Sequence, residues 1–180
     1  MSGVVGNAAR ALALLIGLPA LVLFAYDIAA VRPHLGRIEA VLAAADPEDA
    51  APPERVREMI DHETGGPELS IARMVAHLLR PHDRSGWRHL HEAMLVWLLP
   101  LHLDESQIYG LYCALSYNGT GRGLNDFAER EFGKPLSRLS PKQAATTVAI
   151  TRAPSFYLRD REGLDRRARR LPEASGRMPE

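Results

Sequence analysis

The stretch from residue 88 to residue 154 contains four successive helix patterns, and it constrains the fold more than any other part of the chain. Asp104 and Ser140 are each followed three residues later by glutamine. This spacing is typical of a capping box, in which the two side chains satisfy the first free amides of a helix. We therefore predict helices that begin directly after Asp104 and Ser140. Alternating strand patterns are almost missing from the sequence, so the predicted fold class is all-α.

The composition favours one helical domain over several. The chain has 180 residues, of which 46% are hydrophobic, and its 22 Lys and Arg residues balance 22 Asp and Glu residues. A zero net charge gives no electrostatic reason to expect nucleic-acid binding. The single cysteine, Cys113, lies within an apolar helical pattern and is predicted to be a buried hydrophobic residue.

An uncharged apolar run precedes Asp27 and continues beyond it to Val31. A helix that crosses a membrane needs roughly 20 mostly apolar residues. We predict that residues 1–32 form an N-terminal transmembrane anchor. A cleaved signal peptide and a buried soluble helix are the alternatives, and Pro19 within the apolar run disfavours the signal peptide.

Three further segments follow the anchor. Residues 33–53 are predicted to be a stalk and a proline-rich linker, residues 54–171 a helical domain, and residues 172–180 a disordered tail. A helix from Glu54 ends at Glu63, because two glycines follow Thr64. From its position alone, Glu63 is either a solvated helix-end residue or the carboxylate of a site.

The helix that begins near Arg88 is apolar on all sides from Ala93 to Leu101, which predicts a central helix rather than a surface one. Arg88 and Glu92 are one helical turn apart, so they can pair on the same face.

The seven histidines do not have the spacing of a metal site. No second histidine follows His62 at the distance of one helical turn, and His89 and His91 lie on different faces of their helix. No serine has the context of a nucleophile elbow, and no Gly-rich phosphate loop follows a strand. We predict no metal and no cofactor.

The order of motifs resembles glycosyltransferase family 51, the peptidoglycan glycosyltransferases or transglycosylases. The Arg88–Glu92 segment RHLHE resembles R-K-x-x-E, with His89 in place of lysine. Residues 104–114, DESQIYGLYCA, resemble S-K-D-E-I-L-E-x-Y-L-N, with Glu105 for the lysine and Ala114 for the asparagine. The segments YNGTGRGLNDFAEREFGK and LSPKQAATTVAITRAPSFY and the closing RRARRL resemble the three later motifs of the family in the same order.

Upstream, PPERVREMIDHET resembles the approach to the catalytic acid of the family. This resemblance places Glu63 at the catalytic glutamate position, with Thr64 where the family has aspartate. The F-F-x-H-x-G segment that follows in the family is missing, and its G-G-S-T-I-T-Q-Q motif has no counterpart between Leu79 and Arg88.

The resemblance implies a lysozyme-like helical domain that is tethered by one helix to the outer face of the bacterial cytoplasmic membrane. The implied substrates are lipid II and a glycan strand, and other cell-wall synthesis proteins are possible partners. Glu63 would act as general base, Arg88 and a protonated His89 would face the pyrophosphate, and Glu92 would orient them. Glu63 and Arg88 should line one cleft.

Three functions are compatible with these residues. The first is a minimal glycosyltransferase, and the second is a catalytically inactive descendant that binds glycan or an assembly partner at the membrane. The third is an unrelated small helical membrane protein.

Overall fold

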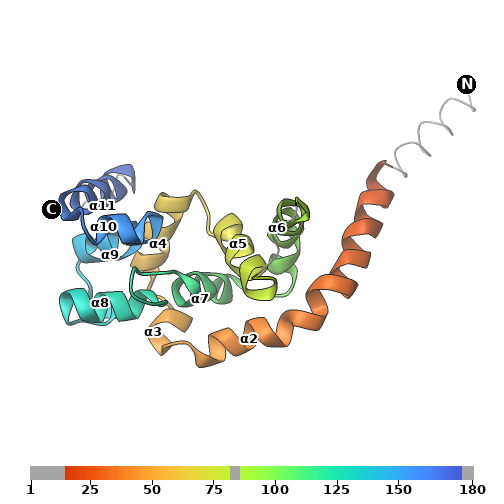
Figure 1. Cartoon of the computed structure of the whole chain (residues 1–180), viewed down its shortest axis with the longest axis horizontal. Coiled ribbons are helices and arrows are strands. Elements are labelled where there is room, and N and C mark those ends of the chain that lie inside the picture. The colour runs from red at the N-terminus through yellow and green to blue at the C-terminus, as the bar shows by residue number, and fades with distance from the viewer. Residues whose placement is uncertain (1–14, 82–85, 176–180) are drawn as a thin grey trace, which may run out of the picture.

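The computed structural model describes residues 15–81 and 86–175, and over these residues the predicted all-α fold is confirmed (Figure 1). The only extended pairing among them is an isolated bridge between Tyr117 and Arg122. After the N-terminal helix, residues 15–26, the elements are η1 Asp27–Val31, η2 Arg32–His34, α2 Leu35–Ala44, α3 Pro47–Ala50, α4 Glu54–Thr64, α5 Glu68–Leu79, α6 Trp87–Leu98, η3 Leu99–Leu101, α7 Glu105–Leu115, α8 Leu124–Phe132, η4 Leu136–Arg138, α9 Pro141–Ala149, η5 Ile150–Arg152, α10 Pro154–Tyr157 and α11 Arg161–Ser175.

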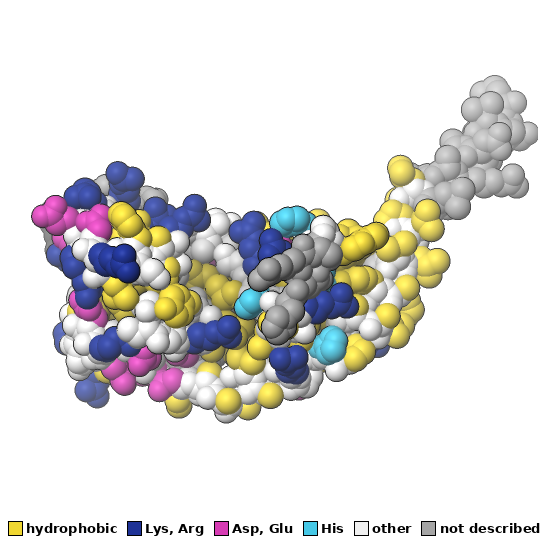
Figure 2. All heavy atoms as spheres, viewed as in Figure 1, with side chains coloured by type: hydrophobic (Ala, Val, Ile, Leu, Met, Phe, Trp, Pro, Cys, Tyr) yellow, Lys and Arg dark blue, Asp and Glu magenta, His cyan; other side chains and the backbone are white. Residues whose placement is uncertain are grey.

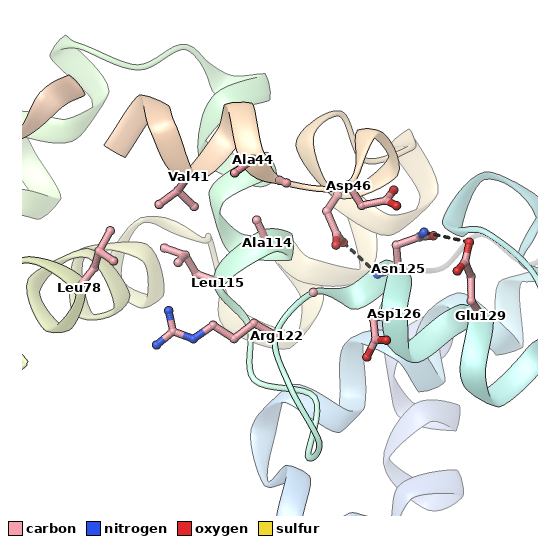
Figure 3. A pocket seen from close by; sticks show the side chains of 13 residues that line it. Val41, Ala44, Asp46, Leu78, Ala114, Leu115, Arg122, Asn125, Asp126 and Glu129 are labelled. Carbon is pink, nitrogen blue, oxygen red and sulfur yellow. Dashed lines mark hydrogen bonds between the residues drawn. The ribbon is translucent and has the colours of Figure 1, made fainter. Parts of the chain in front are cut away.

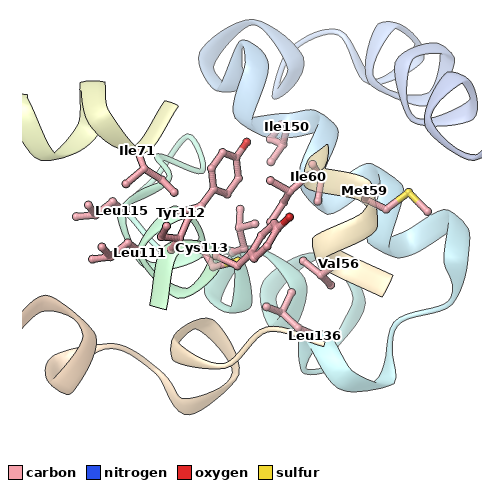
Figure 4. Close-up of a cluster of buried hydrophobic side chains, with 14 of the residues drawn as sticks. Val56, Met59, Ile60, Ile71, Leu111, Tyr112, Cys113, Leu115, Leu136 and Ile150 are labelled. Carbon is pink, nitrogen blue, oxygen red and sulfur yellow. The ribbon is translucent and has the colours of Figure 1, made fainter. Parts of the chain in front are cut away.

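Helix α7 is the centre of the body. It contacts α2 and α3 on one side and α5 and α8 on others, and seven of its eleven residues are buried. Leu111 and Cys113 are fully covered, as the sequence predicts for the cysteine. In Figure 4 the side chains of α7 meet those of α4 and η5, including Ile60 and Ile150. Each such buried aliphatic side chain stabilises the fold by about 1.5–3 kcal/mol.

Gly110 allows α3 to approach α7 closely. A Cβ atom added at this residue would lie 2.4 Å from the backbone oxygen of Ala50. This distance is far shorter than van der Waals contact, so the position requires glycine for reasons of space. The segment around α3 is therefore packed against the core, although the sequence predicts a linker there.

Both predicted capping boxes are present. Asp104 and Gln107 exchange backbone hydrogen bonds at the start of α7, and Ser140 and Gln143 do the same at the start of α9. Between them, the turn before α8 is organised by Asn118, a fully buried residue. Its side-chain oxygen accepts hydrogen bonds from the backbone amides of Thr120 and Gly121.

The N-terminal helix projects from one end of the body (Figure 1). Residues 15–44 form one run of 30 residues that is long and apolar enough to cross a membrane, and a signal sequence also meets this description. Hydrophobic side chains are exposed along its outer part, which Figure 2 shows in yellow. The first 14 residues of the predicted anchor lie outside the described residues.

A buried polar cluster attaches this helix to the body at η1. Asp27 accepts a hydrogen bond from Arg32 Nε at 2.7 Å, and its other oxygen lies 2.6 Å from His102 Nε2. The hydroxyl of Tyr26, the residue directly before Asp27, is hydrogen-bonded to the His91 ring on α6. The apolar run thus ends in contacts with α6 and with His102, the residue that follows η3.

The prediction that the helix after Arg88 is central is wrong. Helix α6 buries Leu95 and Leu98, but Trp87 and Trp97 are 73% and 72% exposed, and Leu90 on the same side is also exposed. Apolar residues on all sides of a helix make its exposure to water unfavourable. They do not show that the rest of the protein covers every face of that helix.

The C-terminal end also differs from the prediction. Helix α11 continues through Ser175, which is beyond the predicted end of the domain at Leu171. The remainder of the predicted tail, residues 176–180, lies outside the described residues.

Candidate functional site

Glu63 lies in the last turn of α4, where Gly65 ends the helix in the left-handed conformation with φ of 73°. Thr64, the residue that follows it, donates its hydroxyl hydrogen to the carbonyl of Ile60. Only 3% of the Glu63 side chain is exposed, so the position predicted as a catalytic carboxylate is covered rather than frayed. A buried carboxylate needs hydrogen-bond donors or a cation, because its desolvation is costly.

Arg167 on α11 supplies that cation. Its Nε lies 3.0 Å from Oε1 and 3.1 Å from Oε2 of Glu63, and its NH2 group lies 2.5 Å from Oε1. This hydrogen bonding raises the pKa of Arg167, so the guanidinium remains charged. The two residues are 104 positions apart, and nothing in the local sequence predicts the contact.

Glu92 on α6 is surrounded by three basic side chains. Its carboxylate lies 3.3 Å from Arg88 Nε, 3.5 Å from His89 Nδ1 and 4.0 Å from Arg73 Nε on α5. The structure therefore brings together three of the four predicted site residues, Arg88, His89 and Glu92. It adds Arg73, which the motif comparison missed.

These side chains line a hollow of about 490 Å³ between the facing ends of α5 and α6. Its lining contains three arginines, two histidines and one carboxylate, namely Arg73, His77, Arg80, Arg88, His89 and Glu92. Figure 2 shows Arg side chains in dark blue and His side chains in cyan on this part of the surface. Arg73, His77 and Arg80 follow one another at helical spacing, a signal by which the sequence could have revealed them. We call this space the cationic hollow.

Glu63 lines a neighbouring hollow of about 320 Å³, which we call the Glu63 hollow. Arg73 and Met74 of α5 also border it, together with Tyr112, Ser116 and Arg152. The expectation of a single cleft is therefore corrected. Glu63 and Arg88 line two hollows, and Arg73 is the residue that both share.

Tyr112 occupies the inner wall of the Glu63 hollow. Its hydroxyl lies 3.0 Å from the Thr151 hydroxyl. Burial raises the pKa of Tyr112 to about 12, and the nearby Glu63 acts in the same direction. Tyr112 is thus protonated at neutral pH and can donate a hydrogen bond in this hollow, but it cannot act as a base.

A third hollow, of about 520 Å³, opens between α2, α7 and α8 (Figure 3). Ala114, one of the departures from the family motif, lines it with Asp49 and Arg122. Asp49 accepts hydrogen bonds from the amides of Leu124 and Asn125 at 3.0 and 2.9 Å, so it caps the start of α8. The acid therefore has a structural function here.

No group of three or more His, Cys, Asp or Glu side chains among the described residues is arranged to hold a metal ion.

The Transglycosylase family model matches residues 62–175, which is more than half of the chain. The chain belongs to the transglycosylase family. This match confirms the resemblance to glycosyltransferase family 51 and excludes the unrelated membrane protein. Both hollows are bordered mainly by residues within the matched range, and the N-terminal helix precedes it.

Curated relatives of this transglycosylase-family chain carry the same kind of name. It is 31% identical over 108 residues to a biosynthetic peptidoglycan transglycosylase of Methylobacillus flagellatus, which covers 58% of the chain and 47% of that protein. It is 32% identical over 108 residues to one of Chromobacterium violaceum, with the same coverage. The chain thus spans about half the length of the curated relatives it matches. No significant match was found among solved structures.

Proposed function

We propose that this transglycosylase-family chain is a membrane-anchored peptidoglycan glycosyltransferase, which transfers the lipid-linked disaccharide of lipid II to a growing glycan chain. The observation that carries the proposal is the cationic hollow beside the hollow of Glu63. Three arginines and one carboxylate line this hollow, and an anionic ligand such as a pyrophosphate suits the excess of positive charge.

In the proposed reaction, Glu63 accepts the proton of an acceptor sugar hydroxyl as that oxygen bonds to the anomeric carbon of the donor. The bond between this carbon and the pyrophosphate oxygen breaks, and the pyrophosphate leaves with the electron pair. Arg88 and Arg73 stabilise the negative charge that develops on the leaving group. Glu92 holds both arginines in place, because its carboxylate lies within ion-pair distance of each.

His89 stands where the family resemblance expects a lysine, and it adds positive charge only when protonated. A histidine with an ordinary pKa of about 6.5 is mostly neutral at pH 7. Arg73 on α5 and Arg80 directly after it supply fixed charge on the opposite wall of the cationic hollow. We propose that they replace the charge that the histidine does not provide.

We further propose that the N-terminal helix anchors the protein in the bacterial cytoplasmic membrane as a single span, with the body on the outer face. Its length and apolar composition support this proposal. The contact between Asp27 and His102 adds to it, because these largely buried side chains join the end of the apolar run to the body.

The contact between Glu63 and Arg167 favours a second candidate function. Both carboxylate oxygens of Glu63 accept hydrogen bonds from the guanidinium. A base with fewer free lone pairs is less reactive, and a chain in which this ion pair is permanent would bind lipid II or glycan without turnover.

Polymerisation of lipid II by the purified full chain in detergent tests the proposal. The wild type should form glycan polymer, and Glu63→Gln should form none, because the amide cannot accept the proton. Glu58→Gln is the matched control, since Glu58 is an exposed residue on the same helix and should retain wild-type activity.

The two candidate functions give different results in this experiment. Binding of lipid II without polymer, under conditions in which a known transglycosylase is active, would refute the enzymatic function and support the binding function. If the wild type neither polymerises nor binds lipid II or glycan, both are wrong.

A further inference from the structure

We infer that Arg167 is the positioning residue of Glu63, which holds Oε1 in place and leaves Oε2 to accept the proton of the acceptor hydroxyl. This inference rests on the proposed function of Glu63 as the base. It adds a residue on the last described helix to a site that the sequence motifs place on α4 and α6.

The hydrogen bonds to the two oxygens are unequal. Oε1 accepts from both Nε and NH2 of Arg167, at 3.0 and 2.5 Å, whereas Oε2 accepts only from Nε at 3.1 Å. An ionised carboxylate offers about four lone-pair sites over its two oxygens. Oε2 therefore keeps the greater capacity to accept a proton, and the rotation of the carboxyl group is fixed by the contact with Oε1.

The guanidinium is delivered by a rigid element. Helix α11 buries Leu164, Ala168 and Leu171 against the body. Two surface ion pairs on one face of α11 also join it to its neighbours, with Lys142 Nζ at 3.5 Å from Asp165 and Arg161 at 3.0 Å from Glu131. A Glu63 carboxylate that is paired with a residue of this packed helix keeps its orientation during the reaction. Misplacement of a catalytic group by about 1 Å can lower a rate a hundredfold.

Glu63 is the only carboxylate among the described residues that line its hollow. The other charged or titratable groups that line this hollow are Arg73 on α5, Tyr112 on α7, Tyr117 after α7 and Arg152 on η5. Tyr157 on α10 lies near Arg167. Arg73 is mostly exposed and already near Glu92, so its charge is shared with the cationic hollow. Arg167 is the only cation among the described residues that forms an ion pair with the Glu63 carboxylate.

The test compares Arg167→Gln and Arg167→Lys with wild type in lipid II polymerisation across pH 5 to 9. We expect the glutamine variant to have a turnover number about a hundredfold lower at pH 7, with a KM within a few-fold of wild type. The acidic limb of the pH profile should move to higher pH, because an unpaired buried carboxylate favours its protonated form. Lysine, which keeps the charge but not the forked contact, should give an intermediate result.

Arg166→Gln is the matched control. It removes the same charge from the adjacent residue, whose side chain is 62% exposed, and should leave the rate and the pH profile unchanged. An equal loss at every pH in the Arg167 variants would show that Arg167 only stabilises α11, and a faster variant would show that the contact restrains the base. Either result overturns the inference. If the glutamine variant does not fold, the lysine variant decides in the same way.

Carbon-13 NMR of the glutamate carboxyl groups provides a readout that does not require activity. The Glu63 signal, assigned by its loss in Glu63→Gln, should change to its protonated position at higher pH in Arg167→Lys than in wild type. If this change in the Glu63 signal is seen but the wild type makes no polymer, the proposed function is refuted and the positioning role of Arg167 stands. If the wild type makes polymer but the Glu63 signal is the same in Arg167→Lys, the positioning role is refuted and the proposed function stands.

Discussion

Replacement of Asp49 by asparagine should make the protein less sensitive to pH. Asp49 lies in the segment predicted as a linker, and only 3% of it is exposed. Its Oδ1 atom accepts the amide hydrogens of Leu124 and Asn125. An asparagine oxygen can accept the same two hydrogens, so the substitution removes the charge and keeps the helix cap.

The magnitude follows from the pKa of the buried acid. Burial raises the pKa of Asp49 from 3.8 to about 6, and the nearby Asp46 and Asp126 act in the same direction. The folded state therefore binds more protons than the unfolded state between these two pH values. The stabilisation by the proton is complete below pH 3.8 and is lost as the pH rises through 6. At 1.36 kcal/mol per pKa unit, the loss amounts to about 3 kcal/mol by pH 7.

Urea unfolding followed by circular dichroism from pH 4 to pH 8 measures this effect. The difference in free energy of unfolding between wild type and Asp49→Asn should change by about 2.4 kcal/mol over this range, with wild type losing stability relative to the variant as pH rises. Glu162→Gln serves as control, because a side chain that is 91% exposed should give a difference independent of pH. A constant difference for Asp49→Asn, or one of the opposite sign, would refute the argument.

Two further substitutions test the packing of the body and the attachment of the N-terminal helix. Gly110→Ala should lower the free energy of unfolding by about 2 kcal/mol, because its Cβ would meet the Ala50 oxygen. Gly36→Ala should have no such cost, since nothing lies within 4 Å of a Cβ there, and an equal loss in thermal unfolding of both variants would contradict the packing argument. Asp27→Asn should cost about 2 kcal/mol, because the charge that contacts His102 is lost. Limited proteolysis should then cut near residue 30 faster than in wild type, and unchanged cleavage would show that this cluster does not hold the helix.

Features that depend on neighbouring residues could be predicted from the sequence. The capping boxes at Asp104 and Ser140 are correct, because both partners of each box lie within one helical turn. The grouping of Arg88 with Glu92 is correct for the same reason. These local contacts were sufficient to define the fold class and one wall of the candidate site.

Features that depend on distant residues could not be predicted. Arg167 meets Glu63 across 104 positions, and Asp49 caps a helix that begins 75 positions later. The charge of Asp49 and the three prolines of residues 46–53 indicate a solvated linker. The amides at the start of α8 reverse that interpretation, because they offer the acid a buried partner. Trp97 shows the opposite error, since an apolar sequence cannot tell which face the rest of the chain will cover.

The departures from the family motif have different consequences for the proposed reaction. Ala114 lines the hollow of Asp49 rather than that of Glu63, so its effect on the proton transfer is indirect. His89 lies in the cationic hollow, where the arginines of α5 provide fixed charge beside it. Loss of the family lysine is therefore less decisive than the motif alone suggests. Activity depends more on whether Glu63 keeps an oxygen available while paired with Arg167, and the unequal contacts at Oε1 and Oε2 favour that outcome.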